Sequence, residues 1–167
     1  MSATQRSVIL IVSMLLIAGL AGPVPARAAT PVGIGLRPLG FSIDPDQYVL
    51  GVQAVMGKYY AGRFAPSVDF GFGEDMTVIT GNFDLKIDVL SPPKSEAVFY
   101  LGGGPTLSYL SPDGGDSDTE IGLSILGGVK LGMTEKHYYN IEARYGIGDI
   151  PEFKLLAGVM FGFGESD

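Results

Sequence analysis

Residues 80 to 90 read TGNFDLKIDVL, and apolar and polar side chains alternate through this stretch. Phe83, Leu85, Ile87 and Val89 fall on one side, whereas the residues between them are polar or charged. Successive side chains of a β-strand point to opposite faces, and no amphipathic helix has a period of two residues. The stretch therefore predicts a strand with one apolar face and one ionic face.

The same alternation recurs along the chain between residues 32 and 163. It is strongest at 121–131 and 137–147 and weaker in five further segments, each bounded by turn-forming residues. Pro38 and Pro105 fall inside two of these segments, where a proline removes a hydrogen-bond donor from the ladder. We predict eight strands, at 32–41, 48–60, 64–72, 80–90, 97–109, 121–131, 137–147 and 153–163.

The chain begins with the features of a secretory signal peptide. Arg6 precedes an apolar core of 14 residues at 8–21, and Ala26-Arg27-Ala28 supplies the small-x-small pattern that a signal peptidase accepts. A membrane-spanning helix needs about 20 apolar residues, so the core is too short for an anchor. We predict a cleaved signal peptide at 1–28 and one exported domain at 29–167, which holds together without disulfides because the chain has no cysteine.

Charged residues divide into three groups if the strands run up and down with both chain ends in the periplasm. The outer connections and their flanks carry acids and no base: Asp44, Asp46, Glu74, Asp75, Asp113, Asp116, Asp118, Glu120, Asp149 and Glu152. The periplasmic ends carry the bases Lys58, Arg63, Lys94 and Lys136. The inward faces carry a nearly balanced set, in which buried charges are expected to pair: Asp69, Asp84, Asp88 and Glu142 with Arg37, Lys86, Lys130, Arg144 and Lys154.

Aromatic residues gather at the expected strand ends, and only Phe83 lies in mid-strand. Tyr100 and Tyr138 belong to the group at the periplasmic ends. Aromatic rings favour the headgroup level of a bilayer, where they form girdles around transmembrane barrels. A soluble β-sandwich also alternates, but it predicts neither the aromatic girdles nor the three groups of charges.

The chain resembles the small outer-membrane β-barrel proteins of Gram-negative bacteria, the group that includes OmpX and the membrane domain of OmpA. The most specific element is the segment LAGVMFGF at 156–163, which is similar to the C-terminal signal recognised by the barrel assembly machinery. Gly158, Phe161 and Phe163 match that signal. The resemblance implies an all-β fold, an eight-stranded antiparallel up-and-down transmembrane β-barrel in the outer membrane. It also implies contact with outer-membrane lipid, with lipopolysaccharide and, during biogenesis, with the barrel assembly machinery.

The strand number bears on function, because an eight-stranded barrel has an interior that side chains can fill. We therefore expect no open pore, but a structural or adhesive role in which acidic extracellular loops meet an unidentified partner. Two alternatives stay open, namely a narrow channel or carrier for a small solute and a soluble periplasmic β-barrel that binds a ligand. The inward glycines either give room to long ionic side chains or leave a narrow polar cavity.

Few residues suggest further chemistry. Asp113, Asp116, Asp118 and Glu120 offer oxygen ligands at alternate positions, a type that Ca²⁺ or Mg²⁺ accepts, although a solvated acidic loop has the same composition. The only histidine, His137, is expected to face lipid at the periplasmic end, so we expect no enzyme and no resident cofactor. The exported domain carries 9 bases, because two of the chain's 11 lie in the leader, against 18 acids, which disfavours nucleic-acid binding.

Overall fold

The computed structural model describes residues 31–59, 62–73, 76–93, 95–112, 115–132 and 137–163. The leader predicted at 1–28 lies outside the described residues. None of the described segments forms a helix that is long and apolar enough to cross a membrane. The strands are β1 (Pro31–Ile43), β2 (Gln47–Met56), β3 (Lys58–Tyr59), β4 (Gly62–Phe72), β5 (Met76–Leu90), β6 (Ala97–Pro112), β7 (Asp118–Gly132), β8 (His137–Ile147) and β9 (Phe153–Gly162).

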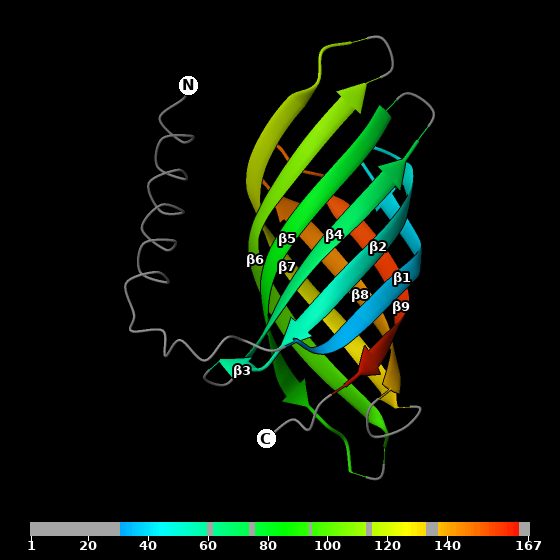
Figure 1. Cartoon of the computed structure of the whole chain (residues 1–167), viewed down its shortest axis with the longest axis vertical. Coiled ribbons are helices and arrows are strands. Elements are labelled where there is room, and N and C mark those ends of the chain that lie inside the picture. Colours follow the sequence, from blue (N-terminus) through cyan, green and yellow to red (C-terminus); the bar gives the residue numbers. More distant parts are fainter. Residues whose placement is uncertain are drawn as a thin grey trace.

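The strands form one antiparallel sheet that closes on itself (Figure 1). Neighbours in sequence are neighbours in the sheet, β1 pairs with β9, and β2 pairs with β4. Strand β3 follows β2 after Gly57 and pairs with the same neighbour, β4, so β2 and β3 together form one interrupted strand of the barrel. With β2 and β3 counted as one strand, the described part of the chain forms an eight-stranded barrel, which confirms the predicted up-and-down architecture.

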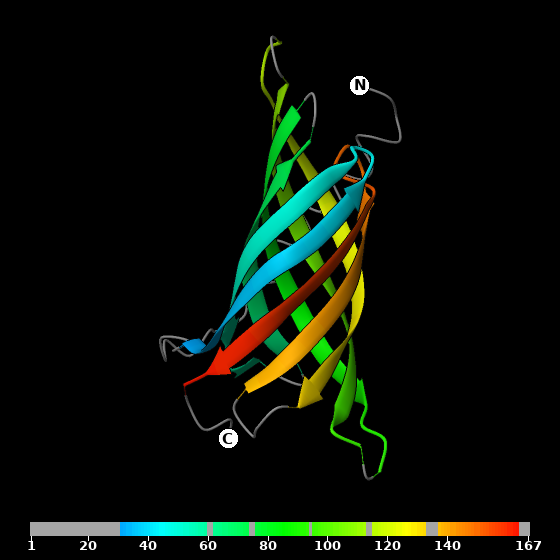
Figure 2. The same ribbon diagram turned by 90° about the vertical axis from the view of Figure 1, so that its right-hand side faces the viewer.

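The two ends of the barrel differ in what they carry (Figures 1 and 2). The chain enters β1 and leaves β9 at the same end, which we call the terminus end. Strands β3, β5 and β7 end there, and β4, β6 and β8 begin there. The opposite end, which we call the loop end, holds the connections from β1 to β2, from β4 to β5, from β6 to β7 and from β8 to β9.

The faces of the strands are inverted relative to a water-soluble domain. On β5, Phe83 is 51% exposed, whereas its neighbours Asn82 and Asp84 are 1% and 0% exposed. Ile125 on β7 and Ile141 on β8 are likewise exposed. The alternation in the sequence therefore has the predicted sense, with the apolar face directed outward and the ionic face directed into the barrel.

The prolines are accommodated in different ways. Pro38 falls where both ladders of β1 are irregular, because pairing with β2 passes from Arg37 directly to Phe41. Pro105 stays within β6, where it is paired with Leu123 of β7. Several strands also extend beyond the predicted limits at the loop end, since the β6–β7 ladder continues until Leu110 pairs with Asp118.

Candidate functional site

Polar and ionic side chains fill the lumen of the barrel. They come from the inward positions of β1, β2 and β4 to β9, which converge because each strand turns every second side chain toward the barrel axis. Seven charged residues are each at most 8% exposed: Arg37, Asp69, Asp84, Lys86, Glu142, Arg144 and Lys154. Ion pairs join all of these except Lys154 into one network, which is the candidate functional site.

Glu142 of β8 is the centre of the network. Its carboxylate accepts hydrogen bonds from Arg37 at 3.4 Å, from Arg144 at 3.0 Å and from the hydroxyl of Tyr100 at 3.0 Å, and it pairs with Lys86. A carboxylate offers about four lone-pair sites, so four donors saturate it. Burial of this negative charge is therefore compensated by groups on four different strands.

Asp84 and Asp69 each have a guanidinium partner of their own. Arg144 donates to both carboxylate oxygens of Asp84, at 3.1 and 2.7 Å. Arg37 donates to Asp69 at 2.5 Å, and the amide of Asn82 donates to the second oxygen of Asp69 at 3.0 Å. Bidentate and charge-assisted bonds of this kind are stronger than neutral ones and also fix geometry. The network thereby holds the long side chains across the lumen.

Glycines on the inward faces make room for these side chains. A Cβ atom on Gly51 would lie 3.1 Å from Nε of Arg37 and closer still to Asp69. A Cβ atom on Gly158 would lie 2.9 Å from Cγ of Arg37. Of the two roles considered for the inward glycines, the structure gives these two positions the first, because long ionic side chains occupy the space that a larger residue would need.

The network crosses the interior of the barrel. Its ion pairs and the Tyr100 hydrogen bond join side chains of β1, β4, β5, β6 and β8, so they connect strands on different sides of the barrel. A buried ion pair contributes little net stability, but removal of one partner costs about 3–5 kcal/mol because the other charge stays buried without compensation. The arrangement is therefore suited to keeping one fixed, filled interior.

The predicted metal ligands lie apart from this network, at the loop end. Asp118 and Glu120 belong to β7 and Asp116 to the connection before it, whereas Asp113 lies outside the described residues. Asp118 accepts a hydrogen bond from the backbone nitrogen of Thr119 at 2.7 Å. Within the described ranges, no three His, Asp or Glu side chains are grouped closely enough to hold a metal ion. The four-residue site stays a prediction, since one of its ligands is not described.

Two aromatic residues lie at the predicted end of the barrel but turn inward. Tyr100 and Tyr138 lie inside the lumen at the terminus end, and Tyr100 is only 2% exposed, so they do not belong to the lipid-facing girdle. The hydrogen bond from the Tyr100 hydroxyl to Glu142 was not predicted from the sequence. The signal was that Tyr100 alternates with Phe99 and Leu101, which both face outward. The glycines that follow carry no side chains, so the alternation of apolar and polar residues is lost along β6. His137, at the same end, packs edge-on against Phe161 with ring centroids 5.7 Å apart.

Two solved structures are similar to most of this chain. The crystal structure of Neisserial surface protein A, NspA, has a TM-score of 0.59 and 21% sequence identity, and the match covers 78% of this chain and 94% of that one. The N-terminal β-barrel domain of Pseudomonas aeruginosa OprF has a TM-score of 0.60 and 16% identity, with coverages of 80% and 98%. No protein-family model and no curated protein matches the chain. The likeness shows the fold, an eight-stranded barrel of the outer-membrane type.

Proposed function

We propose that the chain is an integral protein of the Gram-negative outer membrane, with a filled barrel and a structural or adhesive role exerted through its acidic loop end. The observation that carries the proposal is the outward apolar surface. Large apolar side chains are exposed along every long strand, among them Leu36, Phe83, Leu101 and Ile125. An apolar surface of this extent leads to aggregation in water, whereas lipid hydrocarbon solvates it.

The ionic network supports the absence of an open pore. Conduction through the barrel would require ions to pass Glu142 and the donors that surround it, all of which are buried and paired with one another. Displacement of any one group would leave its partner charged and uncompensated. A structural or adhesive role is therefore favoured over a channel, because it uses the rim of the barrel and leaves the interior fixed.

The loop end supplies the charge for such a role. Its described connections and flanks carry Asp44, Asp46, Asp116, Asp118, Glu120, Asp149 and Glu152. Carboxylates are ligands for hard divalent cations, and these cations also bind the anionic groups of lipopolysaccharide. We propose that Ca²⁺ or Mg²⁺ at this end, with Asp113, Asp116, Asp118 and Glu120 as ligands, links the barrel to lipopolysaccharide, and that the same acids attract basic extracellular partners.

Membrane integration is tested by two simple measurements. Sodium carbonate washing of isolated envelopes should leave the protein in the membrane pellet, and the unboiled protein should migrate differently from the boiled one on gels. Release by carbonate together with an unchanged mobility would support a soluble periplasmic barrel instead. In planar bilayers the purified protein should show no stepwise conductance, and regular conductance steps would support the channel alternative.

The loop-end role is tested by calorimetric titration of the detergent-folded barrel with Ca²⁺. The native chain should release or take up heat and melt at a higher temperature in Ca²⁺. A variant with Asp116→Asn, Asp118→Asn and Glu120→Gln should lose both effects, whereas Glu96→Gln, a neutralisation at the terminus end, should keep them. Absence of heat and of a melting shift in the native chain would remove the cation part of the proposal.

A further inference from the structure

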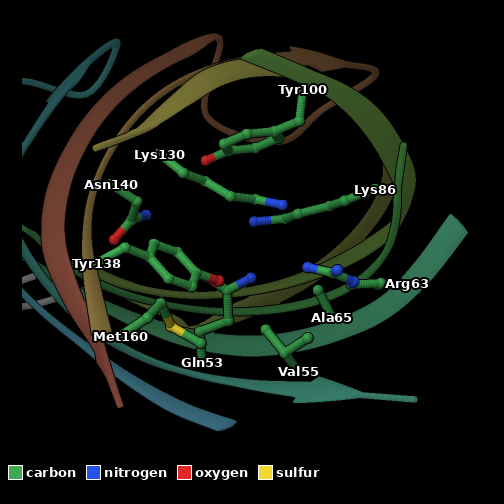
Figure 3. Close-up of a pocket in the computed structure, with 10 residues that line it drawn as sticks. All are labelled: Gln53, Val55, Arg63, Ala65, Lys86, Tyr100, Lys130, Tyr138, Asn140 and Met160. Atoms are coloured by element: carbon green, nitrogen blue, oxygen red, sulfur yellow. The ribbon is translucent and has the colours of Figure 1, made fainter. Parts of the chain in front are cut away.

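A small cavity lies in the lumen between the ionic network and the terminus end (Figure 3). Its free volume is about 20 Å³. One wall is apolar and consists of Val55, Ala65 and Met160, which pack together. The other walls carry Arg63, Lys86, Lys130, Tyr100, Tyr138 and Asn140. The cavity is therefore lined by hydrogen-bond donors on one side and by apolar side chains on the other.

Two ammonium groups converge in this cavity. Figure 3 shows the side chains of Lys86 and Lys130 reaching toward each other from opposite walls, with the ring of Tyr100 beside both. Their Nζ atoms lie 5.2 and 5.4 Å from the Tyr100 ring centroid, and that of Lys130 lies 5.9 Å from the Tyr138 centroid. The rings hold the two cations by cation–π attraction. Like charges brought together in a low-dielectric site repel, so an anion between them is strongly favoured.

The acids nearby neutralise this convergence only in part, because each is shared with other bases. Asp88 is the carboxylate partner of two bases, Lys130 at 2.5 Å and Arg63 at 4.0 Å. Glu142, the partner of Lys86, is shared with Arg37 and Arg144. Across the described interior and its mouth, six bases face four acids: Arg37, Arg63, Lys86, Lys130, Arg144 and Lys154 against Asp69, Asp84, Asp88 and Glu142.

Donor capacity leads to the same result. An ammonium group has three donors and a guanidinium has five, and neither accepts a hydrogen bond. In the described part of the chain, Lys130 and Arg63 share one carboxylate partner, that of Asp88. Both side chains line the cavity, and a monatomic anion can accept charge-assisted hydrogen bonds from several such donors at once.

The size of the cavity selects the class of anion. One water-sized sphere needs roughly 10–15 Å³ of such volume, so about 20 Å³ leaves room for one small monatomic ion or one water molecule and not for a phosphate group. We infer that this cavity binds one monatomic halide ion, chloride in the cell, between the ammonium groups of Lys86 and Lys130. The inference concerns the lumen alone and holds whatever partner the loop end binds.

Bromide is the probe for this site because its anomalous X-ray scattering distinguishes it from water. Crystals of the full barrel grown in sodium bromide should show an anomalous peak between Lys86 and Lys130. At equal ionic strength, bromide at about ten times its Kd should raise the melting temperature by about 3 °C relative to gluconate, an anion too large to enter. A cavity without an anomalous peak, filled by water, would overturn the inference.

Two variants separate binding from a general salt effect. Lys130→Met should lose both the peak and the bromide-dependent melting shift, and Arg63→Gln, at the partly exposed mouth, should weaken both if the first variant does not fold. Lys154→Met is the matched control, because this second surplus cation lies at the loop end, where its Nζ bonds to Thr80 at 2.8 Å. The control should keep the full shift. Equal shifts in Lys130→Met and the native chain would contradict a site at Lys130.

Discussion

Arg144 of β8 and Asp84 of β5 lie 60 residues apart in sequence and meet inside the barrel, where both terminal nitrogens of the guanidinium donate to the two carboxylate oxygens. Both side chains are buried, and the strands that carry them are not neighbours in the sheet. The contact therefore exists only when the barrel is closed. It makes the ionic network a property of the complete fold rather than of any single hairpin.

Replacement of Arg144 alone should therefore be costly. Arg144→Met leaves Asp84 without an ion-pair partner and removes one donor from Glu142, and it should lower the free energy of unfolding by about 3–5 kcal/mol. Urea unfolding of the barrel in detergent or lipid measures this loss. The double variant Arg144→Met with Asp84→Leu should be more stable than Arg144→Met, because both charges are gone. A double variant as unstable as the single one would mean that packing, not charge, dominates at this position.

Gly128 should tolerate no side chain, because Tyr100 occupies its space. A Cβ atom there would lie 2.5 Å from the Tyr100 hydroxyl oxygen and 2.6 Å from the carbonyl oxygen of Ile141. Gly128→Ala should displace the ring, weaken its bond to Glu142 and reduce stability by about 1–3 kcal/mol. Gly57→Ala is the control, since nothing lies within 4 Å of its Cβ position, and it should change stability by less than about 0.5 kcal/mol. Equal losses at the two glycines would argue against the steric explanation.

Outward positions should respond to charge according to their depth in the bilayer. Phe83 lies in the middle of β5 and Tyr48 at the loop end of β2, and both are exposed. Phe83→Arg should cost about 2–4 kcal/mol in lipid vesicles, whereas Tyr48→Arg should cost about 0–1 kcal/mol. The measurement is reversible unfolding in vesicles. Identical small effects at both positions would mean that the apolar band does not face hydrocarbon.

Glu120 provides a pH-dependent test of crowding at the loop end, outside the apolar band. Partial burial raises the pKa of its carboxyl, and repulsion from Asp149 and Asp118 raises it further. The folded barrel therefore holds this proton more tightly than the unfolded chain does. The stabilisation is complete below the unfolded pKa, near 4.5, and is lost as pH rises through the higher folded pKa.

Glu120→Gln should accordingly make the barrel more stable than the native chain at neutral pH, with the difference disappearing in acid. Urea midpoints over a pH series give this comparison. In an Asp149→Asn background the difference should shrink, because Asp149 raises the pKa of Glu120 more than Asp118 does. A difference that grows toward acidic pH would contradict the direction assigned to this pKa.

Much of the fold was predictable because a strand exposes its two faces at a period of two residues. The segment at 137–147 was placed with both limits correct, and all nine charges assigned to inward faces line the lumen or its mouth. The single strand predicted at 48–60 is interrupted, since Gly57 separates β2 from β3. Ladder bonds extend strands past the alternating segment, so limits at the loop end were set too short.

The partners within the lumen were not predictable, since alternation gives the face of a residue but not its height. Height depends on the stagger between strands, which places Arg37 of β1 beside Glu142 of β8, 105 residues away. The saturation of Glu142 by groups from four strands thus needed the structure. The face of Tyr100 was not predicted, because Gly102, Gly103 and Gly104 hide the alternation along β6.

The pairing of β1 with β9 has a consequence for how the protein is made. This ladder runs from Gly33 opposite Gly162 to Ile43 opposite Phe153, so it joins the first and the last strand of the chain. Until residues 153–162 have joined the sheet, β1 and β8 each lack a partner on one side, and unpaired edges are prone to aggregation. A premature stop codon should therefore yield no smaller barrel, only an open ribbon for envelope proteases to degrade.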